Sequence, residues 1–267
     1  MDAQNGKKCI KISGVKCLDI PLTLDCGQSF RWTQNGKAFH GIASGRKVDV
    51  FTEDGNLYII GDSDEKFWRR YFDLDRDYDE ICSRFLSDKY LKAAVEAYSG
   101  IRILRQDSWE ALCSFIISQN NNIPRIKGII ERLCRLCGDE IDGEYAFPSA
   151  QTLSLLTPDD LSEIRAGFRA KYIIDAAKKV SSGEVDLEKI NGMTLDEARA
   201  ALQKITGVGP KVAECTLLYG FGKIDAFPVD VWVKRIMSEM YENGLPECTD
   251  GVKGIAQQYL FHWRRNM

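Results

Sequence analysis

One stretch of the chain, residues 205–234, constrains the fold and the chemistry more than any other. It reads ITGVGPKVAECTLLYGFGKIDAFPVDVWVK. Gly207 and Gly209 allow positive φ and let backbone amides face outward, and Pro210 suits the first turn of a helix. Residues 194–205 begin with a capping-box pattern and continue with apolar residues at helical spacing. The stretch therefore predicts a helix, a tight glycine turn and a second helix, whose N-terminus suits a phosphate.

Two side chains of this stretch are candidates for chemistry. Lys211 lies in the first turn of the second helix, where a cation opposes the helix dipole. It is either a surface lysine that binds phosphate or pairs with Glu214, or a nucleophilic amine able to form a Schiff base. Partial burial and the dipole would lower the pKa of such an amine. Asp230, 19 residues further on, suits an N-cap, and a capping carboxylate can also turn one oxygen into a pocket.

Three segments carry a resemblance to a known family. Residues 208–213, VGPKVA, and 228–231, PVDV, resemble the helix-hairpin-helix and Gly/Pro…Asp signature of a DNA glycosylase superfamily. Residues 27–32, GQSFRW, and 118–126, SQNNNIPRI, resemble segments of the 8-oxoguanine DNA glycosylases. The segments occur in the family's order and span most of the chain. The resemblance implies a bifunctional glycosylase/AP lyase that removes 8-oxoguanine opposite cytosine, with Lys211 as nucleophile and Asp230 stabilising the cationic sugar.

The resemblance also implies which residues contact the damaged base. Gly27 is on local grounds a turn glycine. In the family its carbonyl accepts a hydrogen bond from N7 of 8-oxoguanine, where guanine has only a lone pair. Gln257 would contact the Watson–Crick edge of the flipped base, Phe261 would stack on its face, and Cys215 would line the same pocket. Without the family, Phe261 would read as a core residue of a C-terminal helix.

A further set of residues would contact the DNA. The asparagines at 120–122 are typical of a helix cap and turn, but the resemblance implies that Asn120 fills the hole left by the flipped nucleotide. Arg125 and Arg169 would donate to O2 and N3 of the orphaned cytosine. Phe168 would act as a wedge beside the lesion. The alternatives are a solvated arginine for Arg125 and a core residue for Phe168.

The hairpin around Gly207 and Gly209 would grip backbone phosphates, and the resemblance implies a structural monovalent or divalent cation on its carbonyls. We expect no catalytic metal or redox cofactor, because a lysine nucleophile and one carboxylate suffice for this chemistry. The chain departs from the family at Trp232, where other members carry a histidine that contacts phosphate. That departure puts this phosphate contact in doubt.

Charge and cysteine content bound the partners and the compartment. The 267 residues include 36 Lys and Arg against 39 Asp and Glu, so DNA binding requires basic residues segregated on one face. The nine cysteines are an odd number in a chain of this size, which favours free thiols. No window approaches a membrane span, and residues 1–13 lack an apolar signal core. We expect a monomer with duplex DNA as partner and no membrane contact, in the cytoplasm or, in a eukaryote, the nucleus.

The sequence predicts an α+β fold, with an N-terminal antiparallel β-sheet domain at 1–104 and a mostly α-helical helix-hairpin-helix domain at 105–267. The predicted strands are residues 8–12, 30–32, 47–52 and 56–60, the last two joined by a turn at 54–55. Cap patterns and apolar residues at helical spacing predict several helices. They are 78–86, 107–117, one that ends at Cys137, one that begins at 157–160, and one in the C-terminal tail.

Three alternative functions fit parts of the pattern. A glycosylase for another lesion would keep Lys211 and Asp230 but need other pocket residues. A non-catalytic DNA-binding protein would use only the hairpin, and its function would survive Lys211→Gln. A purely structural or protein-interaction role predicts no salt-dependent DNA binding.

Overall fold

The computed structural model describes residues 8–267, and contacts divide the chain into two compact units. The first unit comprises the described residues up to Ile42, together with Arg46–Arg105 and Ile224–Met267. The second comprises Ala43–Gly45 and Gln106–Lys223. These units are groups of contacts and do not test the domain division at residue 104, which stays a prediction.

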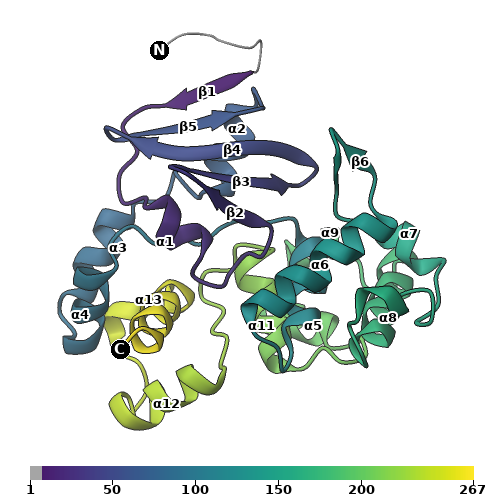
Figure 1. The fold of residues 1–267 in the computed structure, drawn as a ribbon. Coiled ribbons are helices and arrows are strands. Elements are labelled where there is room, and N and C mark those ends of the chain that lie inside the picture. The colour runs from purple at the N-terminus through teal and green to yellow at the C-terminus, as the bar shows by residue number, and fades with distance from the viewer. Residues whose placement is uncertain (1–7) are drawn as a thin grey trace. The chain divides into compact units, whose positions relative to one another are not determined.

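The first unit contains a five-stranded antiparallel sheet in the order β1-β5-β4-β3-β2 (Figure 1). The strands are β1 (Cys9–Ile12), β2 (Trp32–Asn35), β3 (Ala38–Ala43), β4 (Arg46–Glu53) and β5 (Asn56–Ile60). Asp54 and Gly55 both have positive φ, 50° and 71°, as a two-residue hairpin turn requires. The sheet followed by helices confirms the predicted α+β class.

Strand β3 was not predicted, because Gly41 and His40 interrupt its β-rich pattern. The structure explains the glycine. Gly41 pairs with Trp32 across the β2–β3 ladder, and a Cβ at Gly41 would overlap the Trp32 ring. Glycine has a low propensity for strands, but the packing of the Trp32 ring requires it at position 41.

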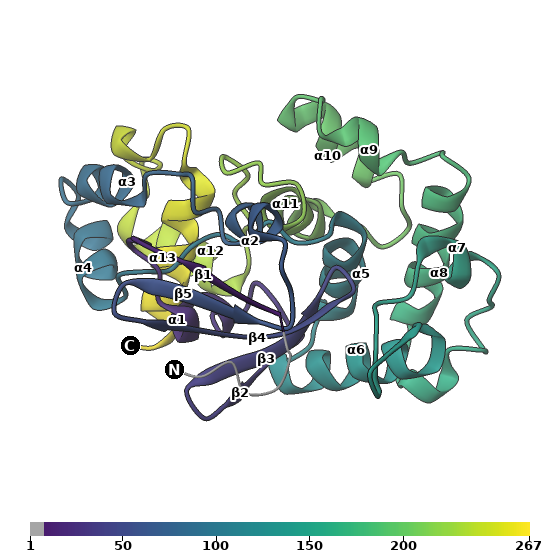
Figure 2. The same cartoon turned by 90° about the horizontal axis from the view of Figure 1, so that it is seen from above.

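The helices of the first unit follow the sheet and return at the C-terminus. They are α1 (Ile20–Leu24), α2 (Glu65–Tyr71), α3 (Tyr78–Phe85), α4 (Lys89–Ala97), α12 (Val231–Met240), the 3-10 helix η2 (Glu247–Thr249) and α13 (Lys253–Arg265). Helix α2 lies against the sheet (Figure 2), where Trp32 Nε1 donates to the Tyr71 hydroxyl at 3.0 Å. This contact joins the sheet to helix α2, in which Trp68 is also buried.

Helix α13 is the central helix of this unit. It packs against α4 and α12, and the Tyr259 hydroxyl donates to the Ile101 carbonyl at 3.1 Å. Seven consecutive residues, Gly254–Leu260, are buried. The predicted C-terminal helix is thus confirmed.

The second unit is mostly helical. Its elements are α5 (Ser108–Ser118), α6 (Ile123–Cys137), α7 (Ala150–Ser154), η1 (Ser162–Ile164), α8 (Arg169–Ser181), α9 (Leu187–Ile190), α10 (Leu195–Leu202), α11 (Pro210–Tyr219) and the short pair β6 (Glu140–Ile141) and β7 (Glu144–Tyr145). Asp107 caps α5, and Thr194 and Glu197 form the predicted capping box of α10. The predicted helix start at 157–160 is wrong: Asp160 accepts hydrogen bonds from the Thr157 amide and hydroxyl, which closes a turn there.

Candidate active site

The predicted site residues fall into two groups, one on each compact unit. The second unit carries Lys211, Cys215, Asn120, Arg125, Phe168, Arg169, Gly207 and Gly209. The first unit carries Gly27, Asp230, Gln257 and Phe261. Each group has its own geometry.

The amine of Lys211 lies against helix α5. Pro210 opens α11, so Lys211 stands in the first helical turn as predicted, and its side chain is half-buried. Lys211 Nζ lies 3.5 Å from Ser118 Oγ and 5.2 Å from the centroid of the Phe115 ring. The Ser118 hydroxyl donates to the Phe115 carbonyl at 2.8 Å, which leaves its oxygen lone pairs to accept from the amine. Cys215 is buried one turn further along α11.

Ser118 and Phe115 were not predicted as neighbours of the lysine. They precede it by 93 and 96 residues, so no local spacing could connect them. Glu214, which one interpretation paired with Lys211, accepts a hydrogen bond from Arg199 Nε and is itself buried. This contact joins α10 to α11 on the two sides of the glycine turn.

The glycine turn is held by helix α8. Gly207 has φ +84°, and a Cβ there would overlap the Tyr172 ring, so the position requires glycine on both counts. The Asp175 carboxylate accepts from the Thr206 amide at 2.7 Å and lies 3.0 Å from Lys179 Nζ. Burial alone raises the pKa of Asp175, but these hydrogen bonds outweigh it and the pKa lies below its usual range. An ionised carboxylate thus holds the turn.

The three asparagines after α5 do different things. Asn120 is exposed and in the left-handed conformation, with φ +49°. Asn121 Nδ2 donates to the Ile117 carbonyl at 2.9 Å, which helps to end α5. Asn122 caps α6 by accepting from the Arg125 amide at 2.9 Å, as a helix cap and turn predicts. Only the first asparagine presents its side chain outward from a strained backbone position.

Arg169 is turned into the protein. Its side chain is 4% exposed, Nε donates to the Gln119 carbonyl at 2.8 Å, and Nη2 donates to the Asn120 carbonyl at 3.2 Å. Nη1 donates to the Ala166 carbonyl at 3.1 Å. Burial and the nearby charge of Arg125 lower the pKa of Arg169. In this structure Arg169 fixes the loop that carries Asn120, and its predicted contact with cytosine stays a prediction.

Phe168 is the exposed aromatic of this group, at 48%. Its ring lies 5.7 Å from that of Tyr172, edge to face, and the Arg169 guanidinium lies 4.4 Å from its centroid. Tyr172 also packs against Gly207. The wedge candidate and the glycine turn therefore share a neighbour.

In the first unit, Asp230 is the N-cap of α12, as predicted. Its Oδ1 accepts from the Val233 amide at 2.8 Å. The flanking Val229 and Val231 are exposed, which is unusual for branched apolar residues. Trp232 is half-buried, with the Arg235 guanidinium 5.3 Å from its ring centroid.

Helix α13 carries a buried acceptor with no partner. Gln257 is 4% exposed, and its Oε1 has no hydrogen-bond partner within residues 8–267. A buried acceptor left unpaired costs about 1–3 kcal/mol. Phe261, one turn further on, is half-buried. Gly27, the third lesion-binding candidate of this unit, has φ +90° and precedes the buried Gln28.

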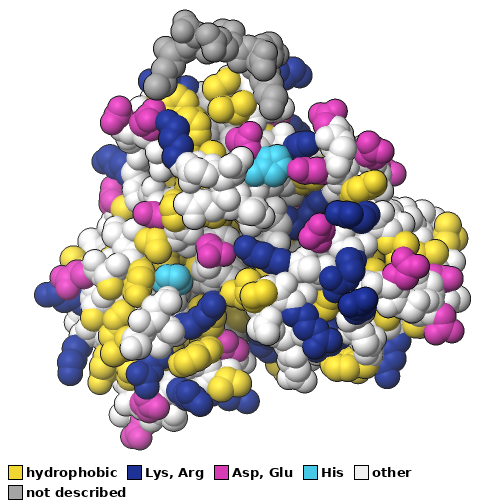
Figure 3. Space-filling view, viewed as in Figure 1, with side chains coloured by type: hydrophobic (Ala, Val, Ile, Leu, Met, Phe, Trp, Pro, Cys, Tyr) yellow, Lys and Arg dark blue, Asp and Glu magenta, His cyan; other side chains and the backbone are white. Residues whose placement is uncertain are grey.

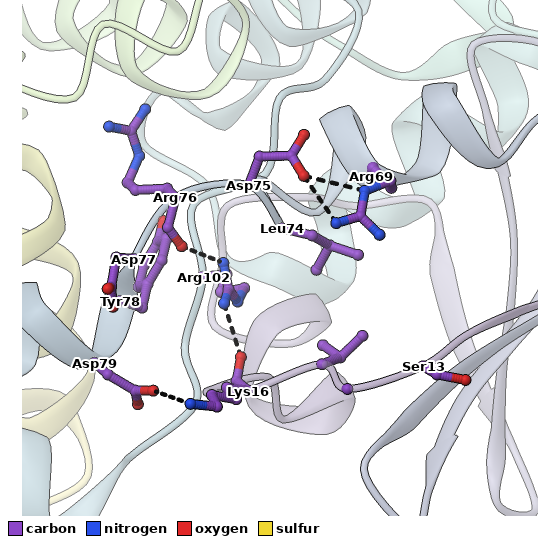
Figure 4. A pocket seen from close by; sticks show the side chains of 12 residues that line it. Ser13, Lys16, Arg69, Leu74, Asp75, Arg76, Asp77, Tyr78, Asp79 and Arg102 are labelled. Atoms are coloured by element: carbon purple, nitrogen blue, oxygen red, sulfur yellow. Dashed lines mark hydrogen bonds and ion pairs between the residues drawn. The ribbon is translucent and has the colours of Figure 1, made fainter.

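The first unit also has a pocket of about 270 Å³ that contains none of the predicted residues (Figure 4). Its charged groups are satisfied internally. Arg102 donates to the carbonyls of Lys16 and Arg76 at 2.7 and 3.4 Å, and Arg69 Nε donates to Asp75 at 3.0 Å. We therefore regard this pocket as a structural feature of the unit.

Helix α6 of the second unit carries a group of basic side chains. Figure 3 shows Lys and Arg gathered over helix α6 of the second unit, whose basic residues are Arg125, Lys127, Arg132 and Arg135. All nine cysteines are free thiols. Among the described residues no group of three or more His, Cys, Asp and Glu could hold a metal ion, and no helix could cross a membrane.

Comparison with known proteins identifies the family. Residues 10–112 match the model of the 8-oxoguanine DNA glycosylase N-terminal domain, and residues 113–246 match that of the HhH-GPD superfamily base excision DNA repair proteins. The chain belongs to the 8-oxoguanine DNA glycosylase family. Among sequence relatives it is 36% identical to a probable N-glycosylase/DNA lyase of Methanothermobacter thermautotrophicus. That match includes 64% of this chain and 62% of the relative, so the chain spans less than two thirds of the relative's length.

Two solved structures of the family are similar over nearly the whole chain. One is described as MBOgg1 in complex with a low affinity DNA ligand, with 41% identity, a TM-score of 0.92, and 97% and 96% of the two chains covered. The other is a Clostridium acetobutylicum 8-oxoguanine glycosylase/lyase bound to dsDNA containing cytosine opposite 8-oxoguanine. It is 38% identical, with a TM-score of 0.90 and 97% of each chain covered.

Proposed function

We propose that the chain is a base-excision-repair DNA glycosylase with AP lyase activity, which removes 8-oxoguanine opposite cytosine from duplex DNA. The observation that carries the proposal is the position of Lys211 within this family's match. Its amine is half-buried directly after a rigid glycine turn, beside a serine oxygen that can accept its hydrogen bond. A lysine so placed suits covalent attack better than a solvated phosphate contact.

The enzyme first exposes the damaged base. An enzyme that acts on a base inside a duplex must extrude the nucleotide and compensate the lost stacking. Asn120, exposed on a loop that Arg169 holds, would enter the space left in the duplex, and the exposed Phe168 would lie beside it. The glycine turn would bind backbone phosphates through its amides. The structural cation on its carbonyls stays a prediction; the Ile205 and Gly209 carbonyls already accept from Val208 and Ala213.

The base would then be checked by the first unit. 8-Oxoguanine carries a hydrogen on N7, which the Gly27 carbonyl can accept, and N1–H and N2–H donors on its Watson–Crick edge. The unpartnered Oε1 of Gln257 supports this role, because a buried acceptor without a partner is stabilised by a donor from a bound ligand. Phe261 would stack on the base, and Cys215 would line the pocket.

The chemistry follows from an amine and a carboxylate. The Lys211 amine attacks C1′, the C1′–N9 bond breaks, and the base leaves with its bonding electrons and takes up a proton. Asp230 stabilises the positive charge that develops on the sugar. Loss of a proton from the nitrogen and opening of the sugar ring give the C1′ Schiff base. Removal of a proton from C2′ then expels the 3′ phosphate by β-elimination, which cuts the strand.

The preference for cytosine opposite the lesion is proposed from the position of Arg125. Arg125 is exposed at the start of α6 and can donate to cytosine O2 and N3, which are acceptors, whereas adenine presents a donor at the same edge. The Clostridium acetobutylicum relative is described with cytosine opposite the lesion, which supports the same preference here.

Borohydride trapping tests the proposal. A duplex with one 8-oxoguanine opposite cytosine is incubated with wild type or Lys211→Gln, and borohydride reduces any Schiff base to a stable adduct. We expect an adduct and a cut strand with wild type, and neither with Lys211→Gln. Ser114→Ala is the matched control, because Ser114 is a buried serine of α5 one turn before Ser118.

Other results would change the assignment. Adducts with both proteins would place the nucleophile elsewhere. Base release without any adduct would indicate an enzyme that uses water and would remove Lys211 from that role. Neither adduct nor release would leave a glycosylase for another lesion or a DNA-binding protein without activity.

A further inference from the structure

The loop that carries Gly27 is held from two directions by buried glutamines. Gln28 comes directly after Gly27 and is fully buried. Its Nε2 donates to the carbonyls of Thr23 and Arg102, each at 2.8 Å, and its Oε1 accepts from the Leu104 amide at 2.9 Å. Two of these three bonds fix the loop against the segment at 102–104, more than 70 residues further along the chain, and the third fixes it to Thr23.

The second glutamine comes from the C-terminal helix. Gln258 is 1% exposed, and its Nε2 donates to the Cys26 carbonyl at 3.4 Å, across 232 positions of sequence. A buried amide without a partner would be destabilising, and a leucine of similar size would fill the same space without that cost. A polar residue at this buried position is explained by the link that it makes to the loop.

The hydrogen bonds of Gln258 and Gln28 hold the chain on either side of Gly27. Gln258 holds the peptide before Gly27 through the Cys26 carbonyl, and Gln28 anchors the residue after it. Gly27 has φ +90°. Because glycine adopts positive and negative φ about equally well, its own conformational preference does not fix the direction of its carbonyl. The contacts on both sides determine that direction. A hydrogen bond weakens steeply when its angle falls below about 120°. Direction therefore decides whether that carbonyl can distinguish N7–H from an N7 lone pair.

We propose that Gln258 and Gln28 are positioning residues that fix the Gly27 carbonyl relative to helix α13, and so determine how well the enzyme distinguishes 8-oxoguanine from guanine. Gln258 is adjacent to Gln257 on α13, so the same helix carries one base-reading side chain and the link to the other base-reading group. This inference rests on the proposed function and adds the means by which its two recognition elements are kept in register.

Two rates test the proposal. One is base release from a duplex with 8-oxoguanine opposite cytosine. The other is borohydride trapping on a duplex with a preformed abasic site, which needs Lys211 but no base recognition. Gln258→Leu should slow base release about tenfold, as expected for one lost buried hydrogen bond. Gln28→Leu removes three and should slow it at least as much, and both variants should leave trapping within about twofold.

Binding gives a second measure. In the Lys211→Gln background, Gln258→Leu should lower the ratio of affinities for 8-oxoguanine and guanine duplexes by about tenfold. The matched control is Thr249→Val, which removes another buried hydrogen bond of the first unit, from Thr249 Oγ1 to the Pro246 carbonyl at 2.7 Å. It should leave both the rates and the affinity ratio close to wild type.

The outcomes separate this inference from the proposed function. Equal losses in base release and trapping, or no loss in either, would overturn the positioning role. If wild type itself releases no 8-oxoguanine, the proposed function fails first. If Gln258→Leu does not fold, Gln258→Met keeps the length of the side chain without its amide, and the same comparison applies.

Discussion

At the scale of single residues, helix α13 carries two buried polar atoms without a hydrogen-bond partner among the described residues, each with a different consequence. Gln257 Oε1 and His262 Nδ1 are both buried without a hydrogen-bond partner in the described part of the chain. For Gln257 the proposed function supplies the missing donor, on the flipped base. For His262 burial favours the neutral ring. The same helix thus holds one buried acceptor that the proposed function pairs with a ligand and one histidine whose pKa burial lowers.

A substitution at Phe261 tests the proposed contact of helix α13 with the flipped base. Phe261→Ala removes the ring that would stack on the flipped base, a contact of about 1–3 kcal/mol. We expect release of 8-oxoguanine to fall by roughly tenfold to a hundredfold, measured under single-turnover conditions. Affinity for an undamaged duplex should stay within about twofold, because that binding depends on phosphates.

Trp263→Ala is the control for the loss of a large ring from the same helix, since Trp263 contacts Tyr90 within the first unit. It should leave the preference for damaged DNA intact. Equal losses of lesion release and non-specific binding in Phe261→Ala would remove the stacking role.

At the scale of elements, the second unit shows how one helix organises the segments around a site. Helix α8 supplies Arg169 to the loop at 119–120 and Asp175 to the glycine turn. The Arg169 guanidinium donates to backbone carbonyls of the loop, and the Asp175 carboxylate accepts from a backbone amide of the turn. Such charge-assisted hydrogen bonds restrict the movement of both segments. One helix thus holds both the loop and the turn to which the proposed function assigns DNA contacts.

Arg169→Lys tests this arrangement. Lysine cannot reproduce the fork that contacts the Gln119 and Asn120 carbonyls, so the loop should loosen. Amide hydrogen exchange at residues 119–122 should accelerate by about tenfold or more, as expected when hydrogen bonds from a charged group are lost. Release of 8-oxoguanine should slow as well.

Arg132→Lys is the matched control in the same unit, because Arg132 Nε and Nη2 both donate to the Ile164 carbonyl, at 3.1 and 3.0 Å. It should leave exchange at 119–122 unchanged. Unchanged exchange in Arg169→Lys, with a lost preference for cytosine, would instead favour the direct contact with the opposite base.

At the scale of the whole molecule, the two histidines have different surroundings. His262 Nδ1 is buried, and burial together with the charge of Arg265 lowers the pKa of His262 below its ordinary 6.5, while Asp25 acts in the opposite sense. His40 lies on the sheet with its Nδ1 2.7 Å from Asp49 Oδ1. Burial is therefore expected to oppose protonation of His262.

The free energy of unfolding should fall as the pH drops below about 6.5, the ordinary pKa of histidine. The unfolded chain binds a proton at His262 more readily than the folded chain does, so stability is present above that pH and is lost towards the folded pKa. Denaturant unfolding from pH 7.5 to 5 measures this loss. His262→Gln should flatten the profile in that window, and a profile unchanged from wild type would contradict the assignment.

The sequence by itself determined the features that depend on neighbours along the chain. The capping box at 194–197, the caps Asp107 and Asp230, the turn at 54–55 and the glycine turn before Lys211 were all predicted, because each is decided within about four residues. The three family segments extended this reading to the enzyme class.

The tertiary structure decided what depends on distant residues. Strand β3 leaves room for the Trp32 ring because residue 41 is a glycine. The amine of Lys211 lies beside Ser118, and the Arg169 side chain turns inward to the loop at 119–120. Gln258 reaches Cys26 across 232 positions. Such partners are selected by packing and by the need to satisfy buried polar groups, and neither is encoded in local spacing.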